Sequence, residues 1–150
     1  MSLSFRPARL EDLYAAVALL QARDLPVDGF ADLLRAQPGN VRVAELGGTL
    51  VGCAALDVHG AQALLRSVAV ASDLATLGVG TRVVGDLIKH ARASGVSSIY
   101  LLTTTAAHWF PKFGFTVTDR ASVPAEIAGT VEFKGVCPSS ATVMKVDLTP

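Results

Sequence analysis

The sequence has few charged residues, few aromatic residues, only two cysteines and no net charge. Thirteen Lys and Arg residues balance thirteen Asp and Glu residues, which argues against nucleic acid as a partner, because phosphate backbones attract proteins with a basic excess. Two cysteines do not form a disulfide framework, so we expect a reducing, cytoplasmic setting. No apolar run reaches the length of a membrane span, and the N-terminus shows no signal-peptide core, so we expect no membrane partner.

The residues that are abundant predict one well-filled domain over residues 1–150. Hydrophobic residues make up 51% of the chain, and this fraction suits a sizeable core. Hydrophobic periodicity and turn residues predict helices at 10–20, 30–34, 83–91 and 106–113, a helical turn at 123–128, and strands at 3–8, 41–46, 49–58, 64–71, 99–102, 115–118 and 141–148. The helix at 106–113 should be short or bent, because it contains Pro111. This order predicts an α+β fold, a mixed central sheet with helices on both faces.

The most informative stretch runs from residue 64 to residue 92. An apolar strand leads through Gly78 and Gly80 into a helix whose apolar positions repeat with a period of 3.6 residues. The first amides of a helix lack intrahelical partners, and together with the helix dipole they suit a phosphate or a diphosphate. Two glycines one residue apart are also found in ordinary strand–turn–helix corners, so both interpretations stay open on this pattern alone.

The same stretch resembles the acetyl-CoA-binding segment of the GNAT N-acetyltransferase superfamily. In that family the turn reads Arg/Gln-x-x-Gly-x-Gly/Ala, and here Ala75 stands at its first position. The resemblance implies the GNAT fold, acetyl-CoA as co-substrate, and a strand 64–71 that splays away from strand 99–102. It implies that the backbone N–H of Val68 polarises the thioester. It also implies that the coenzyme contacts Val68, Ala69, Val70, Ala75, Thr76, Leu77, Gly78, Val79, Gly80, Thr81 and Phe110. Arg82, in the first turn of the helix, either adds positive charge near the phosphates or is a solvated surface residue, and both alternatives stay open.

A second block, Leu101 to Phe115, resembles the acetyltransferase domain of bacterial N-acetylglutamate synthases. Together with residues 64–70 and 137–141, it also resembles the small stand-alone GNAT proteins of arsenic-resistance operons. Both resemblances imply a small-molecule acceptor with an amino-acid-like amine. The second resemblance adds phosphinic or arsenical analogues of amino acids and a role in resistance.

The acceptor site is predicted to use charged and hydroxyl side chains. We expect it to involve Arg66, Ser67, Thr103, Thr104, Ser139 and Ser140. Where the family often carries a glutamate base and a tyrosine acid, this chain has Arg66 and Phe110, so the general base is not identified; Asp57 and Glu126 are candidates. Arg66 either clamps an acidic group of the acceptor or forms a structural ion pair, and both alternatives stay open. His59, His90 and His108 are predicted at the surface, and no spacing suggests a metal site.

Two functions from different classes follow. The first is an N-acetyltransferase that acts on an amino acid or an analogue. The second is a weak or inactive GNAT-fold protein that binds an acyl-CoA or an amino acid. The sequence is compatible with a monomer or a homodimer.

Overall fold

A seven-stranded sheet forms the centre of the computed structural model, which describes residues 2–136 and 138–148. The sheet order is β1-β2-β3-β4-β5-β7-β6. The β4–β5 pair is parallel and the other pairs are antiparallel, so the sheet is mixed, as predicted. The strands are β1 (Leu3–Pro7), β2 (Val41–Leu46), β3 (Thr49–His59), β4 (Gln62–Val70), β5 (Ser98–Thr103), β6 (Thr116–Val117) and β7 (Thr142–Asp147).

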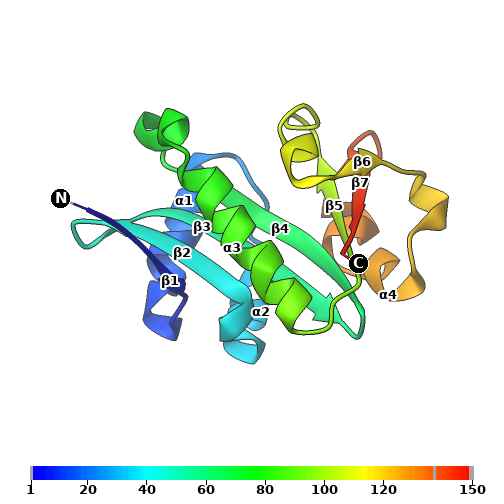
Figure 1. Ribbon diagram of the computed structural model, residues 1–150, viewed down its shortest axis with the longest axis horizontal. Helices are drawn as coiled ribbons and strands as arrows, with labels where there is room; N and C mark the ends of the chain where they lie inside the picture. Colours follow the sequence, from blue (N-terminus) through cyan, green and yellow to red (C-terminus); the bar gives the residue numbers. More distant parts are fainter. Residues whose placement is uncertain (1, 137, 149–150) are drawn as a thin grey trace.

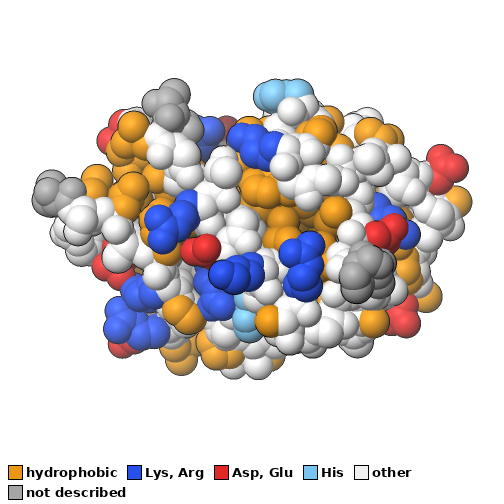
Figure 2. Space-filling model, viewed as in Figure 1, with side chains coloured by type: hydrophobic (Ala, Val, Ile, Leu, Met, Phe, Trp, Pro, Cys, Tyr) orange, Lys and Arg blue, Asp and Glu red, His pale blue; other side chains and the backbone are white. Residues whose placement is uncertain are grey.

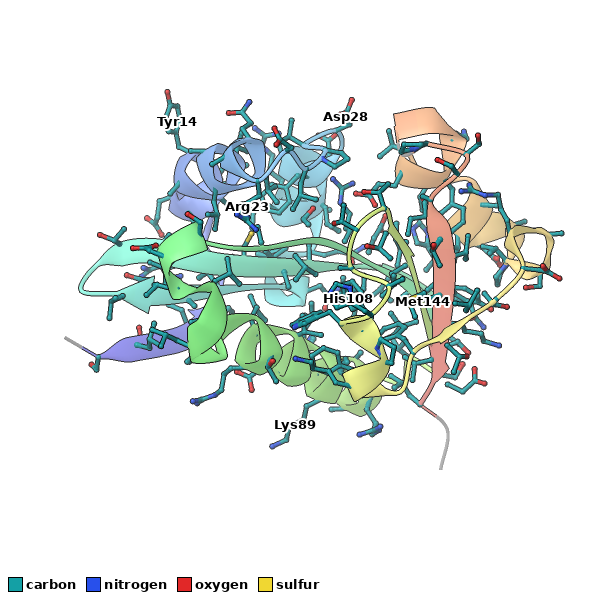
Figure 3. The ribbon with its side chains drawn as sticks, turned by 90° about the horizontal axis from the view of Figure 1, so that it is seen from above. Tyr14, Arg23, Asp28, Lys89, His108 and Met144 are labelled. Atoms are coloured by element: carbon teal, nitrogen blue, oxygen red, sulfur yellow. The ribbon has the colours of Figure 1, made fainter. Side chains whose placement is uncertain are left out.

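Helices cover both faces of this sheet. Helix α3 (Val79–Ala93) lies on one face, whereas α1 (Leu13–Ala22) and α2 (Phe30–Ala36) lie on the other (Figure 1). The view from above shows the sheet between these two helical layers (Figure 3). A short helix, α4 (Ala125–Ala128), packs beside β5 and β7.

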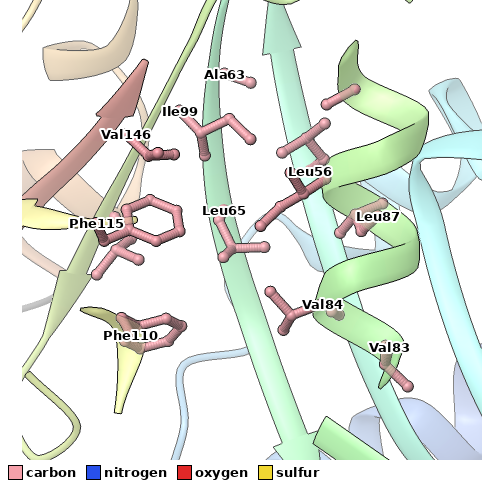
Figure 4. Close-up of a cluster of buried hydrophobic side chains, with 14 of the residues drawn as sticks. Leu56, Ala63, Leu65, Val83, Val84, Leu87, Ile99, Phe110, Phe115 and Val146 are labelled. Carbon is pink, nitrogen blue, oxygen red and sulfur yellow. The ribbon is translucent and has the colours of Figure 1, made fainter. Parts of the chain in front are cut away.

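Helix α3 forms because its apolar side chains recur on one face, and that face is buried. It packs on β2, β3 and β4, and the same cluster continues to the last strands through aromatic side chains (Figure 4). The buried members of this cluster include Leu56, Leu65, Val84, Leu87, Ile99, Phe115 and Val146. A second cluster fills the space under α1 and α2, and includes Leu20, Phe30, Leu34, Val41 and Cys53.

Strands β4 and β5 pair only at one end. Their register runs from Gln62↔Ser98 to Leu64↔Tyr100 and stops there. Beyond that point β4 contains a β-bulge: between the pairs Ala55↔Arg66 and Cys53↔Ala69, β4 has one residue more than β3. Ser67 lies in this bulge and has a φ of 59°. The predicted separation of these two strands is therefore present, and it opens the sheet between them.

Two predicted elements differ in their details. Residues 72–77, expected as a turn, form a 3-10 helix, and α3 then begins at Val79, so Gly80 lies inside the helix. The expected helix at 106–113 is reduced to a 3-10 turn, Phe110–Phe113, because Pro111 has no N–H to continue an α-helix.

Among the described residues, no helix combines the length and apolar character needed to cross a lipid bilayer. Cys137 lies outside the described residues.

Candidate functional site

A cleft of about 710 Å³ opens where β4 and β5 separate. Figure 2 shows hydrophobic side chains between α3 and the end of the sheet that carries β5 and β6. The cleft extends from the N-terminus of α3, along β4, to the loop after α1. Its lining includes Asp24, Arg66, Val68, Val70, Gly78, Gly80, Thr81, Thr103, Thr104, His108, Trp109, Phe110, Glu132, Pro138 and Ala141.

The first turn of α3 lies at this cleft, where Gly78, Gly80 and Thr81 are part of the lining. The first intrahelical bond runs from the Arg82 N–H to the Gly78 carbonyl (3.1 Å), so the amides of Val79, Gly80 and Thr81 precede it. The positive end of the helix dipole lies at the same place. This arrangement can hold a phosphate or a diphosphate, as the sequence predicts.

Glycine is favoured at positions 78 and 80 for different physical reasons. Gly78 has a φ of 75°, which favours glycine, and a Cβ there would meet open space. A Cβ on Gly80 would lie 3.2 Å from Val70 Cγ2 and 3.3 Å from Trp109 Cζ2. Gly80 therefore lets the helix approach β4 and the tryptophan ring, a requirement of packing that the sequence pattern did not reveal.

The backbone of β4 faces the cleft at Val68 and Val70. The Ala71 N–H donates to the Val51 carbonyl on β3 (2.8 Å), and amides alternate along a strand, so the Val70 N–H points the other way. Val68, Ala69 and Val70 all line the cleft; Val68 and Val70 are half-buried, and the side chain of Ala69 packs in the cluster under α1 and α2. An extended ligand can therefore lie along β4 as an added strand.

The other residues predicted to contact the coenzyme differ in their position relative to the cleft. Leu77 is exposed and Phe110 is buried at the cleft, where its ring packs edge-on against Trp109. The side chains of Ala75 and Thr76 lie outside the described part of the chain. The Arg82 guanidinium lies 4.4 Å from the centre of the Phe5 ring on β1, and Arg82 is not part of the cleft lining. A contact of Arg82 with the phosphates therefore stays a prediction.

At the other end of the cleft, Arg66 and Glu132 form a buried pair. Arg66 Nε donates to Ser67 Oγ (2.9 Å) and lies 3.3 Å from Glu132 Oε2. Arg66 and Glu132 are each 4% exposed, and both line the cleft. Arg66 Nη2 is buried and has no hydrogen-bond partner among the described residues. Within the described part of the chain, one edge of the guanidinium is thus bonded and the Nη2 atom is not.

Glu132 was missed by the sequence interpretation. It belongs to the segment Glu132–Val136, which the sequence pattern left as mixed structure. The one local signal is its position between Val131 and Phe133, since a carboxylate between apolar residues often has a buried partner. Asp57 and Glu126 were the carboxylates considered instead. Asp57 pairs with His59 (3.0 Å), Glu126 is exposed on α4, and neither lines the cleft, so both are corrected.

The hydroxyl residues divide into two groups. Thr103 and Thr104 line the cleft, and Thr103 Oγ1 accepts the Ala106 N–H (2.9 Å), which stabilises the turn after β5. Ser139 and Ser140 are exposed and do not line the cleft, whereas their neighbours Pro138 and Ala141 line it, so an acceptor contact by these serines stays a prediction.

The three histidines were predicted at the surface, and they differ in exposure. His108 is exposed at the cleft, and His59 and His90 are half-buried. His90 Nε2 is 2.8 Å from Asn40 Oδ1, and burial and the Arg42 charge lower the pKa of His90. In the part of the chain that the structure describes, no three His, Cys, Asp or Glu residues form a group able to hold a metal ion.

Comparisons with known proteins agree with this geometry. A sequence model of the acetyltransferase (GNAT) family matches residues 8–115. The amino-acid acetyltransferase of Ralstonia nicotianae is 33% identical over 128 residues, covering 81% of this chain and 28% of that protein. The corresponding protein of Azotobacter vinelandii is 28% identical over 136 residues, covering 86% of this chain and 31% of that protein. The chain thus spans less than a third of the length of each of these relatives.

Solved structures show the same fold. N-acetylglutamate synthase from Neisseria gonorrhoeae, complexed with coenzyme A and N-acetyl-glutamate, superposes with a TM-score of 0.83 at 22% identity, covering 100% of this chain and 36% of that one. Rv2747 from Mycobacterium tuberculosis, in complex with CoA, superposes with a TM-score of 0.82 at 26% identity, covering 97% of this chain and 99% of that one.

Proposed function

The chain belongs to the acetyltransferase (GNAT) family, and from this membership we propose that it transfers an acetyl group from acetyl-CoA to the amine of an amino acid or of an amino-acid analogue. The observation that carries the proposal is the separation of β4 from β5 after Leu64, with the N-terminus of α3 at the same end of the sheet. The neighbours from Neisseria gonorrhoeae and Mycobacterium tuberculosis, which were solved with coenzyme A, support the choice of coenzyme.

In the proposed complex, the diphosphate lies on the amides of Val79, Gly80 and Thr81, and the pantetheine arm pairs with β4. The backbone N–H of Val68 then donates to the thioester carbonyl and stabilises the charge that develops on its oxygen. The neutral amine attacks the carbonyl carbon, the C–S bond breaks, and the thiolate of coenzyme A leaves as the amine releases a proton to solvent. Positioning the two substrates alone lowers such a barrier by roughly 7–11 kcal/mol.

We propose that the acceptor lies between Arg66 and the cleft wall formed by Thr103 and Thr104. Arg66 Nη2 is buried, without a partner among the described residues, and belongs to a planar fork that suits a carboxylate. Phosphinic and arsonic groups present similar oxygen pairs, so we include acceptors that carry them. Glu132 holds the Nε edge of the guanidinium and thereby orients it.

Phe110 and Arg66 also favour a second candidate, a protein that binds acyl-CoA without efficient turnover. Phe110 has no hydroxyl to protonate the leaving thiolate, and Arg66 replaces a carboxylate that would deprotonate the amine. The two candidates share the coenzyme site and differ only in the chemical step.

We further propose that residues 1–150 act as one domain, as a monomer or a homodimer.

The test measures thiol release from acetyl-CoA with a panel of amino acids that includes glutamate and its phosphinic and arsenical analogues, alongside calorimetric binding of acetyl-CoA. Turnover on at least one acceptor is the expected result. Coenzyme binding without turnover on any acceptor would favour the second candidate, and the absence of coenzyme binding would overturn both.

A further inference from the structure

The coenzyme end of the cleft has little basic charge on its own turn. Ala75 stands where a basic or amide side chain is common in the family, Leu77 is exposed, and Arg82 packs over Phe5. Backbone amides and a helix dipole supply partial charges only, whereas a diphosphate carries full negative charges.

A lysine from a distant segment lies at this place. Lys112 Nζ is 3.3 Å from Thr81 Oγ1, in the first turn of α3, and 4.7 Å from the centre of the Trp109 ring. Lys112 belongs to the 3-10 turn Phe110–Phe113, which is fixed by edge-on contacts of Trp109 with Phe110 (5.0 Å) and Phe113 (5.1 Å). Trp109 in turn packs on Gly80, so the lysine is attached to the helix terminus through a rigid aromatic cluster.

The position of Lys112 suits an anion held at the helix terminus. The N-terminus of a helix is the positive end of its dipole, so a negative group placed between the helix and the exposed lysine is attracted by both. We propose that Lys112 binds the diphosphate of acetyl-CoA and provides the positive charge that the turn itself lacks. This inference rests on the proposed function and names one more binding residue for it.

The test compares Lys112→Met with the unchanged protein. Methionine keeps most of the apolar stem over Trp109 and removes the charge. We expect the Kd of acetyl-CoA to rise about tenfold, as for the loss of one charge-assisted contact, and its dependence on salt to become weaker. The Kd of 3′-dephospho-acetyl-CoA, which keeps the diphosphate, should rise by the same factor in the variant. With S-acetylpantetheine, which has no phosphate, the variant and the unchanged protein should have equal kcat/KM.

Matched controls separate charge from packing. Lys112→Arg should retain most of the affinity, and Lys89→Met, on the exposed face of α3, should change nothing. An equal loss with S-acetylpantetheine would show that Lys112 only supports Trp109, and unchanged affinity for every donor would overturn the inference. A penalty restricted to ligands with the 3′-phosphate would overturn the assignment to the diphosphate. Failure of the unchanged protein to bind acetyl-CoA would instead overturn the proposed function.

Discussion

Arg66 on β4 and Glu132 on the segment before β7 form an ion pair, with Nε and Oε2 3.3 Å apart and both side chains almost fully buried. Burying two charges is costly, and the pair repays this cost only if its remaining hydrogen-bonding groups find partners. Arg66 Nη2 has no hydrogen-bond partner among the described residues. A carboxylate of the acceptor would supply one.

The first prediction tests this role through Arg66→Lys. Lysine keeps a positive charge for Glu132 but loses the planar fork, so we expect the acceptor KM to rise about tenfold or more while the Kd of acetyl-CoA changes little. Steady-state kinetics with calorimetry measure both quantities. Arg66→Ala should raise the acceptor KM further, at a cost in stability because Glu132 remains buried. An unchanged acceptor KM in both variants would contradict the clamp.

The second prediction concerns Gly80. Its Cβ in Gly80→Ala would be crowded by Val70 and Trp109, so the helix terminus must shift and we expect weaker acetyl-CoA binding and a loss of about 1–3 kcal/mol in the free energy of unfolding. Gly85→Ala is the matched control, because a Cβ at this helical position meets nothing within 4 Å. That control should stabilise the protein by up to about 1 kcal/mol. Equal effects in denaturant titrations of the two variants would contradict the packing explanation.

The third prediction concerns Asp12, which connects β1 to the start of α1. Its carboxylate accepts hydrogen bonds from Arg6 Nη1 (2.7 Å), Arg6 Nη2 (2.9 Å) and the Arg9 amide (2.7 Å). The hydrogen bonds from Arg6 in particular hold the pKa of Asp12 below its ordinary value of 3.8. Because the pKa is lower in the folded state, the stabilisation is complete above pH 3.8 and is lost as the pH falls through the folded-state pKa.

Accordingly, Asp12→Asn should lower the free energy of unfolding by about 1–3 kcal/mol at neutral pH and reduce its decline in acid. Denaturant titrations between pH 3 and pH 7 measure both effects. Asp32→Asn is the control, because the Asp32 side chain is 92% exposed and its contact with Arg35 (3.7 Å) should contribute less than about 1 kcal/mol. A parallel pH dependence in Asp12→Asn and the unchanged protein would argue against the Asp12 linkage.

The fourth prediction concerns Cys53, which is buried under α1 and α2. Burial raises the pKa of its thiol to about 12, and its Sγ donates to the Ser67 carbonyl (3.3 Å). In a Cys137→Ser background, we expect thiol reagents at pH 8 to modify Cys53 at least about a hundredfold more slowly in the folded protein than in denaturant, because the thiolate is the reactive form. Fast modification in native buffer, followed by absorbance, would disagree with this burial.

Much of the fold was predictable because its signals are local. The apolar run of β4 indicated a strand covered on both faces, and the apolar stripe of α3 indicated a helix with one buried face. The separation of β4 from β5 came from the family resemblance rather than from periodicity, and the register confirms it. Pro111 correctly predicted that the helix after β5 would be short, since a proline lacks the amide that the helix needs.

The candidate site was harder to predict because it is built from long-range contacts. Arg66 was predicted to be either a clamp or an ion-paired residue, and the structure shows the pair, with Nη2 unpartnered among the described residues. Its partner, Glu132, follows no periodic pattern. Ser139 and Ser140 were predicted to contact the acceptor, and the structure shows both as exposed residues that do not line the cleft.

By itself, the sequence determined the order of the elements, the faces that they bury and the glycine turn that begins α3, because each depends on residues a few positions apart. Only the tertiary structure decided that Glu132 faces Arg66, that Lys112 reaches the first turn of α3, and that Arg82 turns toward β1. These contacts join segments distant in the chain. Their geometry depends on how complete layers pack, which no local pattern of residues specifies.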